Sequence, residues 1–80
     1  MNVLFFGQLR EVLQTDKLQI NVAVSNVFEL RRELQDKDPL WRDSLEPSVT
    51  LVAVNQTMAN DDTLLEKNDE VAFFPPVTGG

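Results

Sequence analysis

The most regular alternation of hydrophobic and polar positions in the chain covers residues 18–24. Leu18, Ile20, Val22 and Val24 are separated by Gln, Asn and Ala, so their side chains fall on one face of an extended segment. The alternation predicts a strand with one buried, apolar face and one hydrated face.

Further strands are predicted at three apolar runs, residues 3–6, 50–54 and 70–74, which are rich in β-branched and aromatic residues and are bounded by turn residues. Residues 50–54 are apolar or β-branched without a break, which is typical of a central strand buried on both faces. A turn at residues 55–57 leads into a short edge segment around Met58.

Helical periodicity first appears after the first strand. Leu9, Val12 and Leu13 are spaced three and four residues apart, so they lie on one face of a helix. This spacing predicts a short helix over residues 8–14.

A longer helix is predicted from residue 27 onward. Asn26 stands three residues before Glu29, as in a reciprocal N-terminal cap, and apolar residues then recur at helical spacing as far as Leu34. Pro39 ends this helix, because the residue before a proline avoids helical angles. Residues 40–45 are expected to fold back as an apolar cover over the core, and residues 64–65 to form one helical turn.

The order of these elements predicts an α+β fold. Two hairpin-like pairs of strands flank a helix that must cross one face of a mixed sheet, and a right-handed crossover makes the first and last strands parallel neighbours. This is a β-grasp arrangement, a mixed sheet packed on one main helix. We assign residues 1–74 to one β-grasp domain and residues 75–80 to a flexible, extended C-terminal tail.

Composition excludes several kinds of chemistry. The 80 residues suffice for one small domain, and they contain neither Cys nor His. A thiolate nucleophile, the usual zinc ligands and a histidine general base are therefore ruled out, and we predict no metal site. Asp61 and Asp62 are interpreted as a solvated turn, because two adjacent carboxylates lack the spaced ligands of a cation site. An enzyme that acts alone has almost no support.

The net charge of the chain indicates which classes of partner it can bind. Thirteen acidic residues against seven basic ones give a formal net charge of -6. Such a surface repels nucleic acid and anionic membranes and favours a partner with a basic docking face, although solubility alone is an alternative explanation. The apolar runs are too short for a signal peptide or a membrane span. We therefore expect a cytoplasmic protein with no nucleic-acid or membrane partner.

The candidate reactive group lies at the end of the sequence. Gly79 and Gly80 have no side chains to pack and lose much backbone freedom on ordering, so they contribute little to folding. They offer a thin strip of backbone that ends in a carboxylate and fits a channel too narrow for any side chain. The α-carboxylate of Gly80 is therefore the first candidate for chemistry. The preceding tail residues are Pro75, Pro76, Val77 and Thr78.

Adjacent phenylalanines in the first and last strands predict an exposed apolar patch. Alternation along a strand turns one residue of each pair away from the side that the helix covers. We expect Phe6 and Phe74 to face outward, with Met58 close by, as a contact patch beside the tail. The opposite parity is the alternative.

Three segments resemble the ubiquitin-like superfamily and, more narrowly, the family of small, sulfur-carrying subunits of molybdopterin synthase. They are residues 3–11 (VLFFGQLRE), 52–56 (VAVNQ) and 69–80 (DEVAFFPPVTGG). The last segment is the most specific, because it joins the final strand, a proline pair and the Gly-Gly terminus.

The resemblance implies a cycle of sulfur transfer on Gly80. A ubiquitin-activating-type adenylyltransferase, using ATP and magnesium, would convert the carboxylate to an acyl-adenylate. A sulfur donor protein, carrying a persulfide, would displace AMP and leave a thiocarboxylate. The large subunit of molybdopterin synthase would use that sulfur to build the molybdopterin dithiolene from cyclic pyranopterin monophosphate.

The resemblance also implies a division of roles between subunits. The chain would be a non-catalytic carrier that binds no cofactor itself, in a heterotetramer whose catalytic residues lie in the large subunit. It supports Phe6, Met58 and Phe74 as the partner interface and adds Arg10 as a contact at its rim.

Rival functions remain open on the sequence alone. A carrier of the same fold could serve thiazole synthesis or tRNA thiolation, or could be a modifier that forms isopeptide bonds with lysines. A plain β-grasp adaptor without chemistry is a further alternative. The helical segment 8–14 and the pair Pro75-Pro76 favour the molybdopterin branch.

Overall fold

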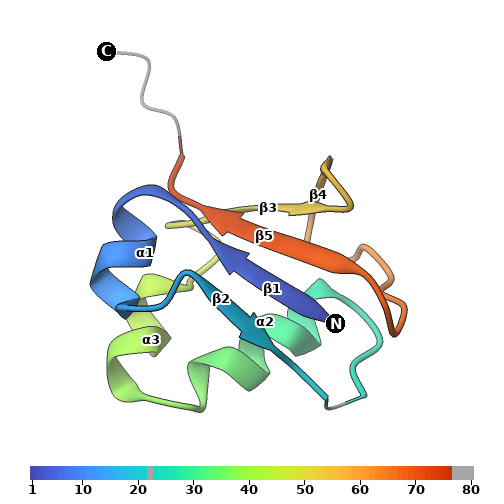
Figure 1. Ribbon diagram of the computed structural model, residues 1–80, viewed down its shortest axis with the longest axis horizontal. Coiled ribbons are helices and arrows are strands. Elements are labelled where there is room, and N and C mark those ends of the chain that lie inside the picture. Colours follow the sequence, from blue (N-terminus) through green and yellow to red (C-terminus); the bar gives the residue numbers. More distant parts are fainter. Residues whose placement is uncertain (22, 77–80) are drawn as a thin grey trace.

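The described part of the chain folds into a mixed sheet with helices on one face (Figure 1). The structure is a computed structural model, and it describes residues 1–21 and 23–76. Within these residues, five strands pair in the order β2-β1-β5-β3-β4. Along the chain the elements are β1 (Asn2–Phe5), α1 (Gly7–Leu13), β2 (Lys17–Gln19), α2 (Val27–Gln35), α3 (Pro39–Ser44), β3 (Leu51–Val54), β4 (Thr57–Ala59) and β5 (Glu70–Phe74).

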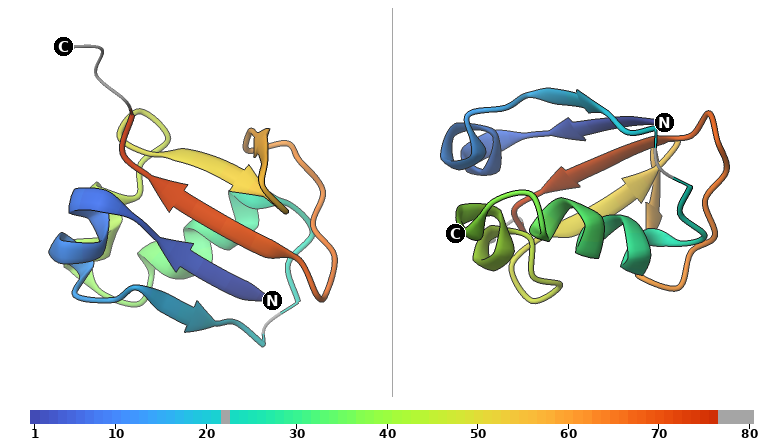
Figure 2. Two further views of the ribbon diagram at one scale, coloured as in Figure 1. Left: turned by 45° about the horizontal axis from the view of Figure 1, so that its top comes forward. Right: turned by 90° about the horizontal axis from the view of Figure 1, so that it is seen from below.

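The first and last strands meet in the middle of the sheet. β1 and β5 run parallel, with Phe5 opposite Phe73, whereas the other neighbouring strands are antiparallel. A parallel pair needs a crossover connection, and α2 lies in that connection, across one face of the sheet (Figure 2). The parallel pairing predicted from the sequence is confirmed.

The core lies between the sheet and the helices. The Phe5 ring stacks on Phe73 with centroids 6.2 Å apart, and it meets Trp41 of α3 edge-on at 5.5 Å. Burying aromatic side chains of this size contributes several kcal/mol at about 25 cal/mol per Å². The most deeply buried side chains are Val3, Phe5, Val71 and Phe73 of the sheet, Val27, Leu30 and Leu34 of α2, and Leu45 after α3.

The beginning of α2 follows the predicted cap closely. Asn26 Oδ1 accepts a hydrogen bond from the Glu29 N–H at 2.9 Å. The Glu29 carboxylate reaches back to the N–H of Ser25 at 2.8 Å, one residue before the position expected for a reciprocal cap. In the described part of the chain, α2 is the longest helix at nine residues, and no helix there is long and apolar enough to cross a membrane.

The second strand is shorter than its alternation predicts. β2 covers Lys17–Gln19 and pairs only with β1, where Asn2 lies opposite Gln19. The Ile20 N–H still bonds to the carbonyl of Met1, directly before β1, at 3.0 Å. β2 therefore stops opposite the first residue of β1, although Ile20 remains buried.

The prediction that residues 50–54 are buried on both faces is wrong. Val52 is buried, but Leu51 is 37 % exposed, because the helices cover only one face of the sheet. The central position belongs to β5.

Three local expectations on the helical side also need correction. Leu64 pairs with Asn26 as a single bridge instead of starting a helical turn, and its side chain is exposed. Leu40 is exposed as well, so only Trp41 and Leu45 of the expected cover pack on the core. Val12 faces outward from α1, whose buried residues are Leu9 and Leu13.

A polar contact ties the β3–β4 hairpin to the start of β5. Asn55 and Gln56 form its two-residue loop with φ of 51° and 69°, in the left-handed region that tight hairpins require. The Asn55 side chain accepts from the Glu70 N–H at 3.1 Å and donates to Asp69 Oδ1 at 3.0 Å. The other Asp69 oxygen accepts from the Glu66 N–H at 2.8 Å.

These contacts predict a pH dependence of stability. The hydrogen bond from the Asn55 side chain, and then that from the Glu66 N–H, lower the pKa of Asp69 below its ordinary value of 3.8. When folding lowers the pKa of a carboxyl group, the fold is stabilised at every pH above the pKa of the unfolded state. This stabilisation is lost as the pH falls through the pKa of the folded state. In urea unfolding at stepwise lower pH, the stability advantage of the wild type over Asp69→Asn should therefore shrink below about pH 4.

Asn55→Ala serves as the companion variant, because it removes the largest cause of the shift. It should lose part of the same acid-dependent stability. An advantage of the wild type that stays constant from neutral pH to pH 3 would contradict this assignment.

Candidate partner-docking face and tail root

The face of the sheet opposite the helices carries an apolar patch. Strand alternation and register place five large side chains there, from β1, β3, β4, β5 and the residue after β1. We call this set the open-face patch, and it consists of Leu4, Phe6, Leu51, Met58 and Phe74. Phe6 is 48 % exposed and Met58 60 %, whereas Leu4 and Phe74 are half-buried.

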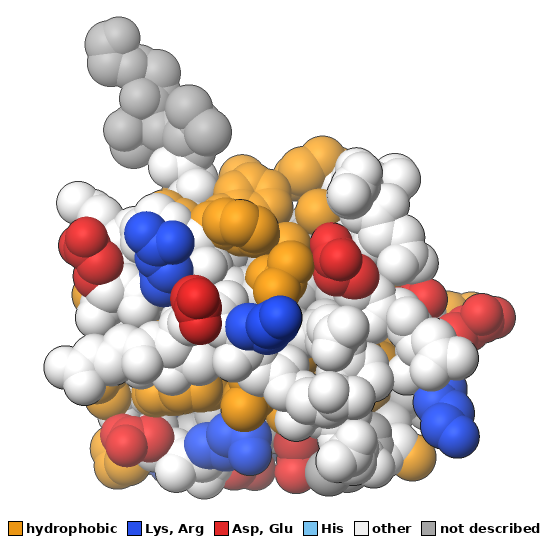
Figure 3. Space-filling view, viewed as in Figure 1, with side chains coloured by type: hydrophobic (Ala, Val, Ile, Leu, Met, Phe, Trp, Pro, Cys, Tyr) orange, Lys and Arg blue, Asp and Glu red, His pale blue; other side chains and the backbone are white. Residues whose placement is uncertain are grey.

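The space-filling view looks onto this open face. Hydrophobic side chains gather over β5 and β3, close to the end of the described chain, with Lys, Arg, Asp and Glu side chains around them (Figure 3). An apolar centre with a charged rim is typical of a protein interface. The patch is thus a candidate docking surface.

The predicted orientation of the phenylalanine pairs is confirmed. Phe5 and Phe73 are buried in the core, and Phe6 and Phe74 point to the other side of the sheet. Leu51 lies opposite Phe74 and also belongs to this face, although the predicted burial of its strand on both faces leaves it out. Side chains alternate along a strand with a period of two, and this alternation, applied to a sheet that helices cover on one side only, predicts that Leu51 faces outward.

Arg10 is exposed and lies in the last turn of α1, whose N-cap residue is Phe6. Phe6 has an extended backbone, so helical spacing does not fix where Arg10 lies relative to the Phe6 side chain. The role of these side chains in partner binding stays a prediction.

The root of the tail is fixed against the start of α1. The Phe6 N–H donates to the Phe73 carbonyl at 3.1 Å, and Pro75 is half-buried beside Gly7. Gly7 has a φ of +61°, and a Cβ at this position would lie 3.3 Å from Pro75 Cγ. This close approach was not foreseen. Pro76 is exposed, while the predicted tail residues Val77, Thr78, Gly79 and Gly80 lie outside the described residues.

A small hollow flanks the tail root on the side away from the patch. It has a volume of about 130 Å³, and Pro75, Leu9 and Thr50 contribute to its wall. Val12 and Val49 line it as well, each 45 % exposed. Pro75 therefore leaves the fold between two partly apolar surfaces.

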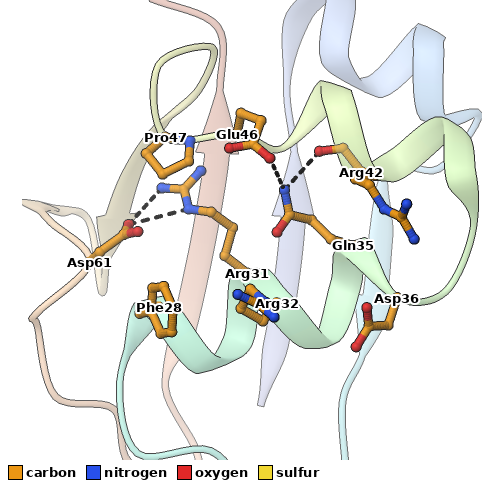
Figure 4. Close-up of a pocket in the computed structure, with 9 residues that line it drawn as sticks. All are labelled: Phe28, Arg31, Arg32, Gln35, Asp36, Arg42, Glu46, Pro47 and Asp61. Atoms are coloured by element: carbon orange, nitrogen blue, oxygen red, sulfur yellow. Dashed lines mark hydrogen bonds and ion pairs between the residues drawn. The ribbon is translucent and has the colours of Figure 1, made fainter.

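A larger hollow of about 360 Å³ on α2 and α3 contains no set of side chains arranged as in a catalytic or metal site. Its walls carry three arginines and three carboxylates, so its charges balance (Figure 4). Asp61 pairs here with Arg31 at 2.9 Å and is half-buried, which corrects its interpretation as part of a solvated turn. Among the described residues, no group of three His, Cys, Asp or Glu side chains could hold a metal ion.

Comparison with known proteins gives the family. The sequence model of the ThiS family matches residues 3–80. The chain belongs to the ThiS family. It is 44 % identical to the molybdopterin synthase sulfur carrier subunit of Escherichia coli K12, over 100 % of this chain and 99 % of that protein.

Solved structures agree with this membership. SAMP1 from Haloferax volcanii superposes with a TM-score of 0.80 at 26 % identity, covering 99 % of this chain and 97 % of that one. A chain of the complex of subunits 1 and 2 of the molybdopterin-converting factor from Helicobacter pylori 26695 gives a TM-score of 0.68 at 30 % identity, covering 99 % of this chain and 96 % of that one. The β-grasp fold and the resemblance to sulfur-carrying subunits of molybdopterin synthase are thereby confirmed.

Proposed function

We propose that this protein is the sulfur carrier subunit of a molybdopterin synthase and that it carries sulfur as a thiocarboxylate on Gly80. The observation that carries the proposal is the position of the tail root. The central strand β5 runs directly into Pro75, beside an exposed apolar face. The full-length similarity to the Escherichia coli sulfur carrier supports the same function.

The chemistry of a carboxylate explains the need for partners. A carboxylate is a poor electrophile, and conversion to an acyl-adenylate supplies a good leaving group. An adenylyltransferase of the ubiquitin-activating type performs this step with ATP and magnesium, and a sulfur donor protein then displaces AMP. This chain contains no Cys or His, so its own part is to present Gly80.

The synthase large subunit is the proposed recipient of the sulfur. It accepts the tail, transfers sulfur to cyclic pyranopterin monophosphate and forms the dithiolene, with its own catalytic residues, in a cytoplasmic heterotetramer. We place its docking site on the open-face patch with Arg10 at the rim. The Helicobacter pylori relative was solved together with a second subunit, which supports a stable partner of this kind. The net charge of -6 suits a partner surface that is basic around the contact.

Intact-mass measurement tests the cargo. The chain is incubated with ATP, magnesium, the activating enzyme and a sulfur source. We expect the C-terminal peptide to gain the mass difference between one sulfur and one oxygen, and to lose it again when the large subunit and its substrate are added. Absence of the gain would contradict the carrier function, and lysine-linked adducts would favour the modifier alternative.

Deletion of Gly80 tests where the sulfur is held. Sulfur transfer should be abolished, while the melting temperature should stay within about 1 °C of the wild type, since a glycine has no side chain to pack. A chain with an amidated C-terminus is the matched control, because it keeps every residue but lacks the carboxylate. It should also be inactive, whereas an adaptor without chemistry would be unaffected by amidation.

A pair of equally exposed phenylalanines tests the docking face. Phe6→Asp should raise the Kd for the large subunit at least about thirtyfold, because losing an aromatic anchor at an interface costs about 2 kcal/mol or more. Its stability should hold, since Phe6 is the N-cap of α1 without a side-chain cap bond, and Asp is favourable at that position.

The matched control is Phe28→Asp on α2. Phe28 is 49 % exposed against 48 % for Phe6, but it belongs to the helical side of the molecule. Binding measured by calorimetry should be unchanged in this variant. Equal losses of affinity in the two variants would argue against the open-face patch as the docking site.

A further inference from the structure

Arg31 carries a buried positive charge on α2. Only 3 % of the residue is exposed, and its guanidinium bonds to three separate segments of the chain. Nε and Nη2 both donate to Asp61 Oδ1, at 3.2 and 2.9 Å (Figure 4). Nη1 donates to the Leu45 carbonyl at 2.8 Å and to Thr50 Oγ1. The charge is therefore partnered on several sides.

A net gain in stability is a weak explanation for this side chain. Replacing a buried ion pair with apolar side chains of similar volume is often neutral or stabilising, because desolvation offsets the attraction. What an apolar residue at position 31 would lack is the planar fork of donors, which fixes several partners in one geometry. Arg31 is better explained by the arrangement of chain segments that its hydrogen bonds impose.

The hydrogen-bond partners of Arg31 come from three separate segments of the chain. Leu45 is the C-cap residue of α3, Thr50 directly precedes β3, and Asp61 follows β4. The Arg31 guanidinium carbon also lies 5.2 Å from the centre of the Phe73 ring, in a cation–π contact with β5. One side chain thus joins α2 to α3, β3, β5 and the segment after β4.

Two routes connect Arg31 to Pro75. On one side, Phe73 lies two residues before Pro75, and its carbonyl accepts the Phe6 N–H at the start of α1. On the other side, Thr50 and Pro75 line the same hollow of about 130 Å³. Arg31 contacts both Phe73 and Thr50.

We propose that Arg31 is a positioning residue that sets where the tail leaves the fold. Its fork holds the end of β5 and the segment before β3 in the arrangement that places Pro75 beside the open-face patch. The functional consequence rests on the proposed sulfur-carrier function. A partner that grips both the patch and Gly80 fixes both ends of a six-residue tail, which spans at most about 20 Å. A shift of the root then misplaces the reacting carboxylate, and an error of about 1 Å can cost about a hundredfold in rate.

The test compares three variants of the full chain. Arg31→Met keeps the length of the side chain but removes the fork, and Thr50→Val removes one acceptor of the fork. Arg32→Met is the matched control, because Arg32 is the next residue of α2, is exposed, and stacks on Phe28 at 5.7 Å. Each variant, loaded as the thiocarboxylate, is assayed for sulfur transfer to the large subunit and its substrate at varied concentrations of carrier, and for amide exchange at Phe6.

Positioning and simple destabilisation give different results. For Arg31→Met we expect kcat to fall at least about tenfold with KM changed less than about twofold, because the open-face patch is intact. Thr50→Val should show the same pattern with a fall of about threefold. The Phe6 amide should exchange faster relative to the amide of Val71 in the sheet centre, and Arg32→Met should match the wild type in both measurements.

Several results would overturn the proposal. One is a folded Arg31→Met chain with wild-type kcat and Phe6 exchange, and another is a loss of kcat in Arg32→Met as large as in Arg31→Met. If Arg31→Met does not fold, Thr50→Val decides, and wild-type behaviour there rejects the proposal. If the wild type itself forms no thiocarboxylate, the carrier function fails, while the exchange at Phe6 still decides whether Arg31 positions the root.

Discussion

Backbone pairing between β1 and β5 is the constraint on which the other features of this fold depend. It joins the first and last described strands in the middle of the sheet, with Phe5 opposite Phe73. Parallel strands cannot be joined by a tight turn, so the chain between them must cross one face, and α2 lies in that crossover. The same pairing brings the end of β5 next to the start of α1, where the Phe6 N–H bonds to Phe73. The tail root is therefore a direct product of the central pairing.

The register of this pairing couples the core to the candidate docking face. Side chains alternate with a period of two, so the arrangement that buries Phe5 and Phe73 also exposes Phe6 and sets Phe74 on the open face. A slip of one residue would exchange the two sets, and it would lose the buried ring contacts with each other and with Trp41. The stability of the core thus fixes which residues of β1 and β5 face outward.

Local sequence patterns predicted the features of the fold that depend on interactions within a few residues. The helical spacing of α2, the Asn26 cap and the opposite facing of adjacent phenylalanines follow from backbone geometry within a few residues, and the structure agrees with them. The length of β2 depends on its pairing with the start of β1, and the exposure of Leu51 depends on which face the helices cover, so neither is encoded nearby. The pair of Arg31 with Asp61 joins residues with no pattern in common, and only the folded chain brings them together. The tail became a candidate for chemistry through the Gly-Gly end and the family resemblance, which no periodicity supplies.

The proposed carrier has two tasks, docking on a partner through the open-face patch and presenting the tail. The difference between these tasks gives a physical reason for the charged residue at position 31. In the proposed function, the group that carries sulfur lies on an end without side chains that enters a narrow site of the partner, so accuracy has to come from the folded domain that holds the tail. Apolar packing gives stability, but it tolerates small rearrangements of neighbouring segments. A buried guanidinium is less tolerant, because a hydrogen bond lost in the interior leaves a polar group unpaired at a cost of about 1–3 kcal/mol. Placing Arg31 between Thr50 and Phe73 therefore penalises movement of the two segments that flank Pro75.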